Sequence, residues 1–350
     1  MNAKKNAELY DAMLYSLEQN DLIKPLQFDK SATFKSFAID PSGCIVAIDD
    51  DGTILQYKIM PGGKTNLIKR KSENNSRMPV ESAVFANHNI VAYSLKDKTS
   101  YIADLSNNSR TELPVKTDYV RNASIAPDGT CAVAYNNGKV AIVPKSGKPS
   151  SDNVKDFNTR LTDVLATGNG TAYVLCHDGS LVKWDYSNDK ETRILSPRPG
   201  QSAFKMTAIP DMGRIAVCYS DGTMQFIDVN TNKVVDSKTG GHTKLENMVY
   251  DPKTGILALS SADKRISLYN TKDLNATPLA IEEHSLNNSK AKAMFFNNKG
   301  VLFALTDDNQ LRFWDTDITS YANTLRTLNL QPLSQSERDM ILGSDFSAKQ

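Results

Sequence analysis

The sequence predicts an all-β protein, a single seven-bladed β-propeller of four-stranded blades. Two observations predict this fold: a hydrophobic position that recurs at a nearly constant interval, and a polar turn that keeps step with it. The recurring position is occupied by Tyr57, Ile102, Val143, Trp184, Ile227, Tyr269 and Trp314, which lie 45, 41, 41, 43, 42 and 45 residues apart. A repeat of this length indicates supersecondary units that stack and bury their apolar faces against one another.

The polar turns divide each repeat into strands. They fall at 40–43, 127–129, 168–170, 210–213, 251–255 and 297–300, and the second repeat has Asn-His-Asn at 87–89 in their place. Gly, Asn and Asp suit tight hairpins because the favoured hairpin turns need positive φ. A β-rich run, an Asp-Gly type turn and a third strand follow each polar turn. This succession, completed by a looser fourth strand, is the pattern of one propeller blade.

The repeat resembles the WD repeat, which has about 40–45 residues and Pro-Asp-Gly, Asp-Gly and Trp-Asp landmarks. The resemblance covers residues 22–330. Trp-Asp occurs only at 184–185 and 314–315, and Gly-His only at 241–242. The His–Ser–Asp–Trp hydrogen-bond network typical of the family is therefore largely missing, and we expect apolar packing between neighbouring sheets to hold the blades.

Two flanking segments are predicted to be helical. Residues 1–21 carry Leu9, Met13, Leu14 and Leu17 with the spacing of one helix face, and residues 331–350 begin with a capping-box pattern at 334–337. In WD-repeat propellers the strand before the first repeat completes the last blade, and the resemblance assigns that role to residues 22–28. The flanks also resemble those of C-terminal propellers in multi-domain bacterial WD-repeat proteins.

Charge and composition exclude some classes of partner. The chain has 41 basic and 40 acidic residues, a net charge of +1, so no global field would hold nucleic acid or an anionic membrane. No run approaches the roughly 18 apolar residues of a membrane helix. Four scattered cysteines without a Cys-x-x-Cys pair favour a reducing compartment, so we expect a cytoplasmic location. The alternative is a soluble domain of a longer, membrane-anchored chain. We also expect a monomer.

Known catalytic and metal-binding motifs are not found in the sequence. The four histidines are scattered over different repeats, and no metalloprotease, nucleophile-elbow or phosphate-loop motif is present. The acidic run at 49–52 occupies an ordinary Asp-Gly turn and lacks the later Glu of an EF-hand. The basic run at 69–71 is interpreted as part of a solvated loop over 61–78. The sequence therefore predicts no catalytic residue, no metal and no cofactor.

The candidate partner-binding face lies at one end of the ring. In WD-repeat propellers the second residue of the inner strand and the turn between the second and third strands share one face near the central opening. Aligning the polar turns places seven residues at the inner-strand position: Lys35, Glu81, Arg121, Thr162, Lys205, Glu246 and Lys292. The matching turns offer Tyr135, His177 and Tyr219. A face of mixed charge with aromatic residues suits a protein or peptide partner, although a solvated rim without a partner is the alternative.

Two functions of different classes are compatible with this pattern. The first is a non-catalytic scaffold that presents one face of the propeller to a protein or peptide. The alternative is a propeller enzyme of the hydrolase or lactonase type, acting at the central channel. An enzyme needs several convergent carboxylates, histidines or metal ligands at equivalent inner positions. The inner column instead holds four cations, two glutamates and one threonine, which favours the scaffold.

Overall fold

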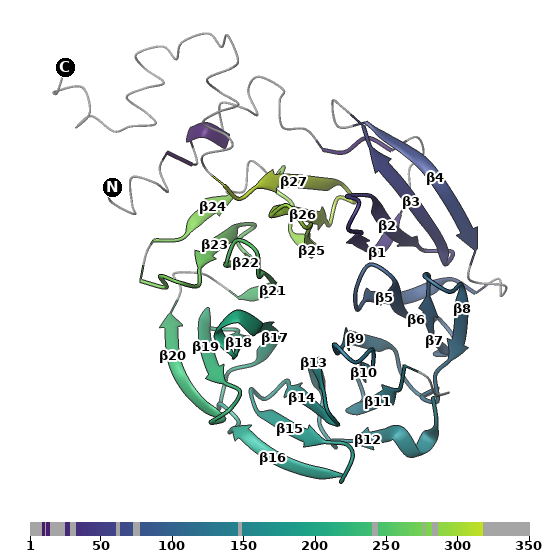
Figure 1. Cartoon of the computed structure of the whole chain (residues 1–350), viewed down its shortest axis with the longest axis vertical. Helices are drawn as coiled ribbons and strands as arrows, with labels where there is room; N and C mark the ends of the chain where they lie inside the picture. The colour runs from purple at the N-terminus through teal and green to yellow at the C-terminus, as the bar shows by residue number, and fades with distance from the viewer. Residues whose placement is uncertain are drawn as a thin grey trace, which may run out of the picture.

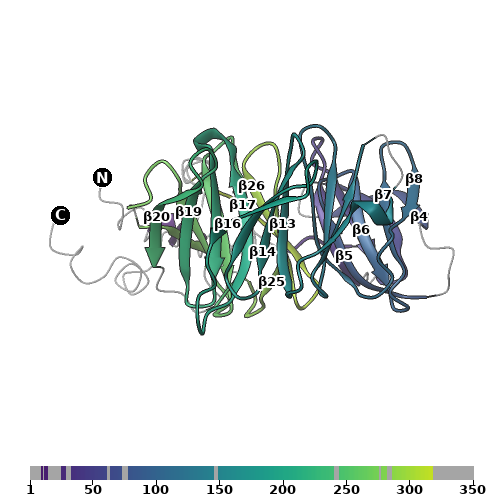
Figure 2. The ribbon, with the colours of Figure 1, turned by 90° about the horizontal axis from the view of Figure 1, so that it is seen from below.

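The protein forms a closed ring of seven antiparallel sheets around a central opening (Figure 1). The computed structural model describes residues 9–10, 12–14, 25–28, 33–60, 64–72, 78–145, 149–239, 244–275, 277–281 and 286–317. Figure 2 shows the ring from the side, where the strands run between its two ends. The structure confirms the predicted seven-bladed propeller. Six sheets have four strands, and the seventh has three within the described part of the chain.

In every blade the chain moves outward from the central opening. The first three blades contain β1 (Phe34–Ile39), β2 (Ile45–Asp49), β3 (Thr53–Ile59) and β4 (Thr65–Ser72); β5 (Val80–Phe85), β6 (Ile90–Leu95), β7 (Ser100–Asp104) and β8 (Ser109–Glu112); and β9 (Val120–Ile125), β10 (Cys131–Tyr135), β11 (Lys139–Val143) and β12 (Val154–Asp156). A short 3-10 turn, η2 (Ser151–Asn153), precedes β12.

The remaining four blades repeat this order. They contain β13 (Leu161–Gly168), β14 (Thr171–Cys176), β15 (Leu181–Asp185) and β16 (Lys190–Leu195); β17 (Ala203–Ile209), β18 (Arg214–Tyr219), β19 (Thr223–Asp228) and β20 (Lys233–Thr239); β21 (Leu245–Asp251), β22 (Ile256–Ser261), β23 (Ile266–Asn270) and β24 (Leu279–Ile281); and β25 (Ala291–Phe296), β26 (Val301–Thr306) and β27 (Leu311–Asp315). The 3-10 turn η3 (Pro210–Met212) links β17 to β18.

The hydrophobic core is divided into seven clusters, one at each interface between neighbouring blades. Side chains that alternate along a strand enter different clusters because successive residues point to opposite faces of a sheet. In β2, Val46 and Ile48 pack toward the second blade, whereas Ala47 packs toward the seventh. Each blade therefore buries both faces only when it has a neighbour on either side.

The recurring hydrophobic position lies on the third strand of every blade. Its seven members pair across the ladder with equivalent residues of the second strand: Tyr57 with Ile45, Ile102 with Ala92, Val143 with Cys131, Trp184 with Ala172, Ile227 with Ile215, Tyr269 with Leu257, and Trp314 with Leu302. All seven are buried, with exposed fractions from 0% to 9%. The position thus supplies one large or branched side chain to each blade.

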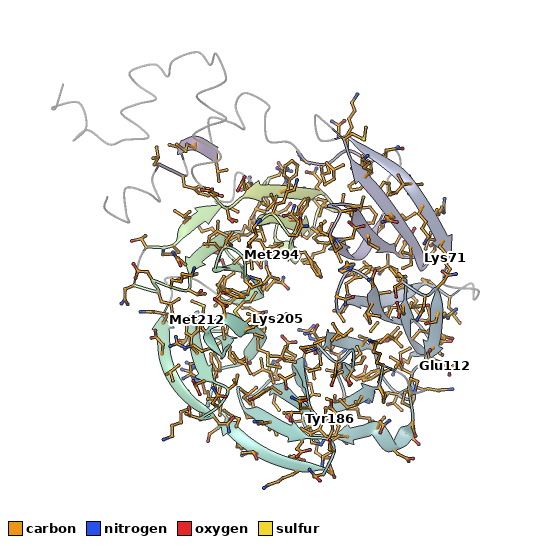
Figure 3. The ribbon with its side chains drawn as sticks, viewed as in Figure 1. Lys71, Glu112, Tyr186, Lys205, Met212 and Met294 are labelled. Carbon is orange, nitrogen blue, oxygen red and sulfur yellow. The ribbon has the colours of Figure 1, made fainter. Side chains whose placement is uncertain are left out.

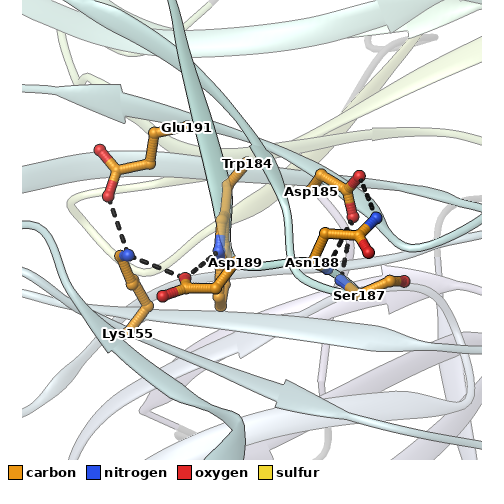
Figure 4. Close-up of polar contacts among 7 residues, drawn as sticks. All are labelled: Lys155, Trp184, Asp185, Ser187, Asn188, Asp189 and Glu191. Carbon is orange, nitrogen blue, oxygen red and sulfur yellow. Dashed lines mark hydrogen bonds and ion pairs between the residues drawn. The ribbon is translucent and has the colours of Figure 1, made fainter.

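Trp184 also joins a polar network between the third and fourth blades (Figure 4). Its indole Nε1 donates to Asp189 Oδ1 at 3.1 Å, and Lys155 Nζ on β12 lies 2.8 Å from the same oxygen. Lys155 Nζ also lies 3.0 Å from Glu191.

The indole nitrogen of Trp314 is buried and has no hydrogen-bond partner among the described residues. Apolar packing is therefore the main restraint on Trp314.

Residues near the N-terminus contact both sides of the junction between the last and first blades. Leu26 N donates to the Leu311 carbonyl oxygen of β27 at 2.8 Å, and Thr65 N of β4 donates to the Gln27 carbonyl oxygen at 3.0 Å. Residues 25–28 therefore link the two blades. The remainder of the strand predicted over 22–28 lies outside the described residues.

The described helical residues 9–10 and 12–14 pack outside the sixth and seventh blades (Figure 1). Tyr10 and Leu14 are fully buried in the cluster that contains Trp314, and the Tyr10 hydroxyl donates to the Asp315 carbonyl oxygen at 2.9 Å. Leu9, which has the spacing of the same helix face, is 36% exposed. Leu17 and the helix predicted over 331–350 lie outside the described residues.

The basic run at 69–71 is also placed differently from the prediction. It belongs to β4, the outer strand of the first blade, and not to a loop over 61–78. β4 exposes Leu67 and Ile68 at 38% and 50%. Charged side chains beside exposed apolar residues on an outer strand hinder pairing with another chain.

Deletion of residues 1–28 tests the link between the last and first blades. We expect a marked fall in melting temperature and aggregation, because the deletion removes the Leu26–Leu311 hydrogen bond and exposes the cluster around Trp314. Differential scanning calorimetry measures the change, and Leu14→Asp serves as a full-length companion variant. An unchanged melting temperature in both variants would show that the N-terminal segment does not stabilise the ring.

Replacement of Trp314 tests the packing at the interface between the sixth and seventh blades. Because Trp314 is fully buried, we expect Trp314→Ala to lower the free energy of unfolding by about 3–5 kcal/mol, the usual cost of such a truncation. Trp184→Phe is the control, since it keeps an aromatic ring and loses chiefly the bond to Asp189. Urea denaturation gives both values. Equal losses in the two variants would contradict the packing account.

Candidate functional site

A β-bulge interrupts the start of the inner strand in all seven blades. In each blade one residue near the start of the first strand is skipped in its pairing with the second strand. The seven skipped residues are Lys35, Glu81, Arg121, Thr162, Phe204, Glu246 and Lys292. A bulge bends the strand and re-aims its extra side chain. We call the end of the ring where these residues lie the bulge end.

The bulge end largely matches the predicted partner-binding column, with one correction in the fifth blade. There the skipped residue is Phe204, because Ala203 pairs with Tyr219 and Lys205 pairs with Cys218. Lys205 therefore lies one position deeper in the strand than predicted. The polar turns alone could not locate this shift, because the skipped residue is set by the ladder pairing of β17 with β18 and not by its distance from the turn.

Four charged bulge residues are exposed to solvent, namely Lys35, Glu81, Arg121 and Lys292. Glu246 is half-buried and its carboxylate lies 3.5 Å from Lys290 Nζ. Thr162 is buried at 4% exposure. Because the bulged residue is not paired in the ladder, its side chain is released from the alternation that directs its neighbours into the interfaces between blades.

The central opening contains a channel of about 370 Å³ lined by the inner strands. Its wall includes six of the residues predicted for the inner column, Lys35, Arg121, Thr162, Lys205, Glu246 and Lys292. Figure 3 shows Lys205 and Met294 beside this opening. The channel therefore combines charged groups at the bulge end with half-buried apolar residues such as Leu165, Phe204 and Val249.

Asp163 and Lys205 connect the fourth and fifth blades inside the channel wall. Lys205 Nζ lies 3.4 Å from Asp163 Oδ2, and their side chains are 26% and 2% exposed. The same carboxylate accepts hydrogen bonds from Met206 N and Val164 N, each at 2.8 Å. Burial raises the pKa of Asp163, and the opposing attraction of Lys205 favours the ionised form. Lys205 is thus held by a structural contact.

Tyr135 and Tyr219 do not belong to the exposed face, contrary to the prediction. Both side chains are fully buried. The hydroxyl of Tyr135 lies 2.9 Å from that of Ser100 in the second blade, and the Tyr219 hydroxyl donates to Gln225 Oε1 at 2.9 Å. Desolvation raises the pKa of Tyr219 to about 12. These aromatic residues stabilise the blades and cannot anchor a partner from where they lie.

His177 lies half-buried in the turn between β14 and β15, at the bulge end. Its backbone nitrogen donates to the Arg160 carbonyl oxygen at 2.8 Å. Desolvation lowers the pKa of the imidazole, and the nearby charges of Arg160 and Arg121 lower it further. His177, predicted from its turn to lie on the partner-binding face, is therefore a titratable group close to the cations Arg160 and Arg121.

The acidic run at 49–52 forms a tight turn. The carboxylates of Asp49 and Asp51 both accept a hydrogen bond from Thr53 N, each at 2.8 Å. In the described ranges no three His, Cys, Asp or Glu side chains are grouped so that they could hold a metal ion. The same residues include no helix with the length and apolar character needed to cross a bilayer.

Comparison with solved structures identifies the architecture. The chain superposes on the WD40 β-propeller domain of Doa1 with a TM-score of 0.66, covering 85% of this chain and 97% of that domain at 12% identity. The fold is a WD40 β-propeller. Periodic tryptophan protein 2 of Arabidopsis thaliana is 24% identical over 140 residues, which are 40% of this chain and 15% of that protein. No family model matches the sequence.

Replacing Lys205 tests its contact with Asp163 in this WD40 propeller. We expect Lys205→Met to lower the free energy of unfolding at pH 7 by about 1–3 kcal/mol, because the buried Asp163 carboxylate loses one of its partners. The pKa of Asp163 is already raised in the folded state, and losing Lys205 raises it further. Acidification then protonates the carboxyl group, so the deficit relative to the wild type shrinks as the pH falls from 7 toward 4.

Urea denaturation at several pH values measures this difference. The conservative variant Lys205→Arg should retain most of the stability at every pH. A deficit in Lys205→Met that stays constant from pH 7 to pH 4 would contradict the ion pair.

Proposed function

We propose that this protein is a non-catalytic interaction scaffold that receives a protein or peptide partner at the bulge end of its ring. The observation that carries the proposal is the row of charged side chains placed there by β-bulges, with Lys35, Glu81, Arg121 and Lys292 exposed. None of these four has an ion-pair partner among the described residues. Their charges are therefore available to complementary groups.

The chemistry of the bulge end supports a protein partner. Cations and carboxylates are interspersed around the channel, and Phe204 adds a half-buried aromatic ring. Mixed charge around a less polar centre is the anatomy of a protein–protein interface, in which a polar rim surrounds apolar contacts. A nucleic acid would require a continuous set of basic groups to neutralise its phosphates, and Glu81 and Glu246 interrupt the basic series.

The cellular setting that we propose follows from the cysteines and the ring closure. All four cysteines are free and buried, and unpaired thiols suit a reducing compartment such as the cytoplasm. Neighbouring blades cover both faces of every sheet. Such a ring needs no second copy to complete its core, so we propose a monomer that binds its partner through one end.

Charge reversal at the bulge end tests the scaffold function. The double variant Lys35→Glu with Arg121→Glu should weaken capture of the natural partner at least about tenfold at low salt, with a smaller effect at high salt because rim charges act through screened attraction. Both side chains are exposed, so the melting temperature should be nearly unchanged. Quantitative pull-down from native lysate followed by binding measurements on the identified protein gives the affinities.

A matched control reverses two cations at the opposite end of the ring. Lys145 and Lys299 are exposed and lie in or beside turns there, so Lys145→Glu with Lys299→Glu should bind the partner normally. Equal affinity of the partner for both double variants and the wild type would refute binding at the bulge end.

A further inference from the structure

At the bulge end the segments that contain Arg160, His177, Phe204 and Lys244 lie next to one another, and they bring basic groups from different blades together. Backbone hydrogen bonds join His177 N to the Arg160 carbonyl oxygen at 2.8 Å, and Ala203 N to the His177 carbonyl oxygen at 3.2 Å. Phe204 follows Ala203 at the bulge of the fifth blade, and Lys244 Nζ lies 4.6 Å from the centre of its ring. We call Arg121, Arg160, His177 and Lys244 the cationic arc.

The charges in the arc act on one another. Burial in the channel wall lowers the pKa of Arg121, although solvent reaches its side chain, and the charge of Arg160 lowers it further. Burial lowers the pKa of His177 most, and the charges of Arg160 and Arg121 lower it further. Asp178 acts in the opposite direction, and Lys244 makes the smallest contribution to lowering this pKa. Burial and the neighbouring cations thus both favour the neutral imidazole of His177.

Asp178 and Asp163 compensate the positive charge of the arc only in part: Asp178 raises the pKa of His177 and Asp163 raises that of Arg121. Arg121, Arg160 and Lys244 have no ion-pair partner within the described chain, whereas other cations at this end do. Arg198 Nη2 lies 3.7 Å from Asp221, and Lys290 Nζ lies 3.5 Å from Glu246. Like charges held together with only part of their counter-charge raise the free energy of the unbound protein, and an anionic ligand would relieve that cost.

We propose that the cationic arc binds the carboxylates of an acidic segment of the partner, and that protonation of His177 strengthens this binding. The inference rests on the proposed function, because it names the chemistry of the segment received at the bulge end. The arc extends over the third to the sixth blades, so its cations are distributed along the rim. Such a distribution suits several carboxylates along an extended chain better than one phosphate group, and Phe204 offers an apolar contact beside them.

The pH dependence follows from linkage. In the free protein the pKa of His177 is lowered, so the imidazole is largely neutral at pH 7. Carboxylates bound beside it favour the charged form and raise that pKa. Binding therefore takes up a proton, and affinity increases as the pH falls through the pKa of the bound state. A shift of one pKa unit corresponds to about a tenfold gain in affinity.

The test uses a synthetic probe on the full chain. An acetylated and amidated ten-residue peptide of aspartate and glutamate with one central leucine is titrated calorimetrically at pH 7.5 and pH 5.5. Its carboxylates stay ionised at both values because their ordinary pKa lies near 4. We expect tighter binding at pH 5.5, with about tenfold weaker binding in Arg160→Gln at both values. In His177→Gln the affinity at pH 7.5 should be retained and the gain at pH 5.5 lost.

Controls define the outcomes that overturn the proposal. Lys299→Gln removes an exposed cation at the opposite end and should leave peptide binding unchanged. Unaltered peptide affinity in Arg160→Gln would overturn the arc as the binding site. A pH dependence that persists in His177→Gln would overturn the role of the imidazole. Binding of inorganic phosphate that depends on Arg160, without binding of the peptide, would instead identify a site for small anions.

The natural partner separates this inference from the scaffold function. If Lys35→Glu with Arg121→Glu weakens the partner but Arg160→Gln does not, the scaffold function stands and the arc is wrong. If the peptide depends on Arg160 while the partner is insensitive to every variant at the bulge end, the arc binds acidic segments and the proposed function fails.

Discussion

Ring closure is the constraint on which the rest of this structure depends. Because every apolar cluster is shared between two blades, no blade has a core of its own, and the junction between the seventh and first blades must be as well packed as the other six. Phe37 and Phe295 meet at that junction with ring centres 5.5 Å apart, and Leu26 adds to the same cluster. Because the interfaces between blades stabilise the fold, the residues at the two ends of the ring are not constrained by core packing.

The bulges connect this constraint to function. A regular inner strand would direct every side chain either into the channel or toward a neighbouring blade, and packing would then select small or apolar residues. The residue skipped at the start of the inner strand escapes that selection in the four blades where it is exposed, while its neighbours keep their register. Charged side chains can therefore accumulate at one end of the ring at little cost in stability. Asp163, which follows the skipped residue Thr162, shows what happens to a charged residue that stays in the ladder. Its carboxylate is buried, and it is satisfied by Lys205 and two backbone amides.

The sequence predicted the repeats well because Trp184, Trp314 and their counterparts combine a fixed interval with a fixed apolar character. It predicted the binding face less well. Tyr135 ends an unbroken apolar run, and nothing in the local pattern shows that its hydroxyl pairs with Ser100 of another blade. The shift from Lys205 to Phe204 depends on a ladder pairing, which spacing along the chain does not reveal. Asp163 could have been suspected, since a charged residue in an apolar inner strand needs a partner.

Hydrogen–deuterium exchange of the protein with and without its natural partner tests the central claim most directly. The account predicts slower exchange at the starts of β9, β13, β17 and β21 and in the turn that contains His177, with no change at the turns of the opposite end. Protection confined to those opposite turns, such as the one at 87–89, or to the exposed outer strand β4 would contradict binding at the bulge end.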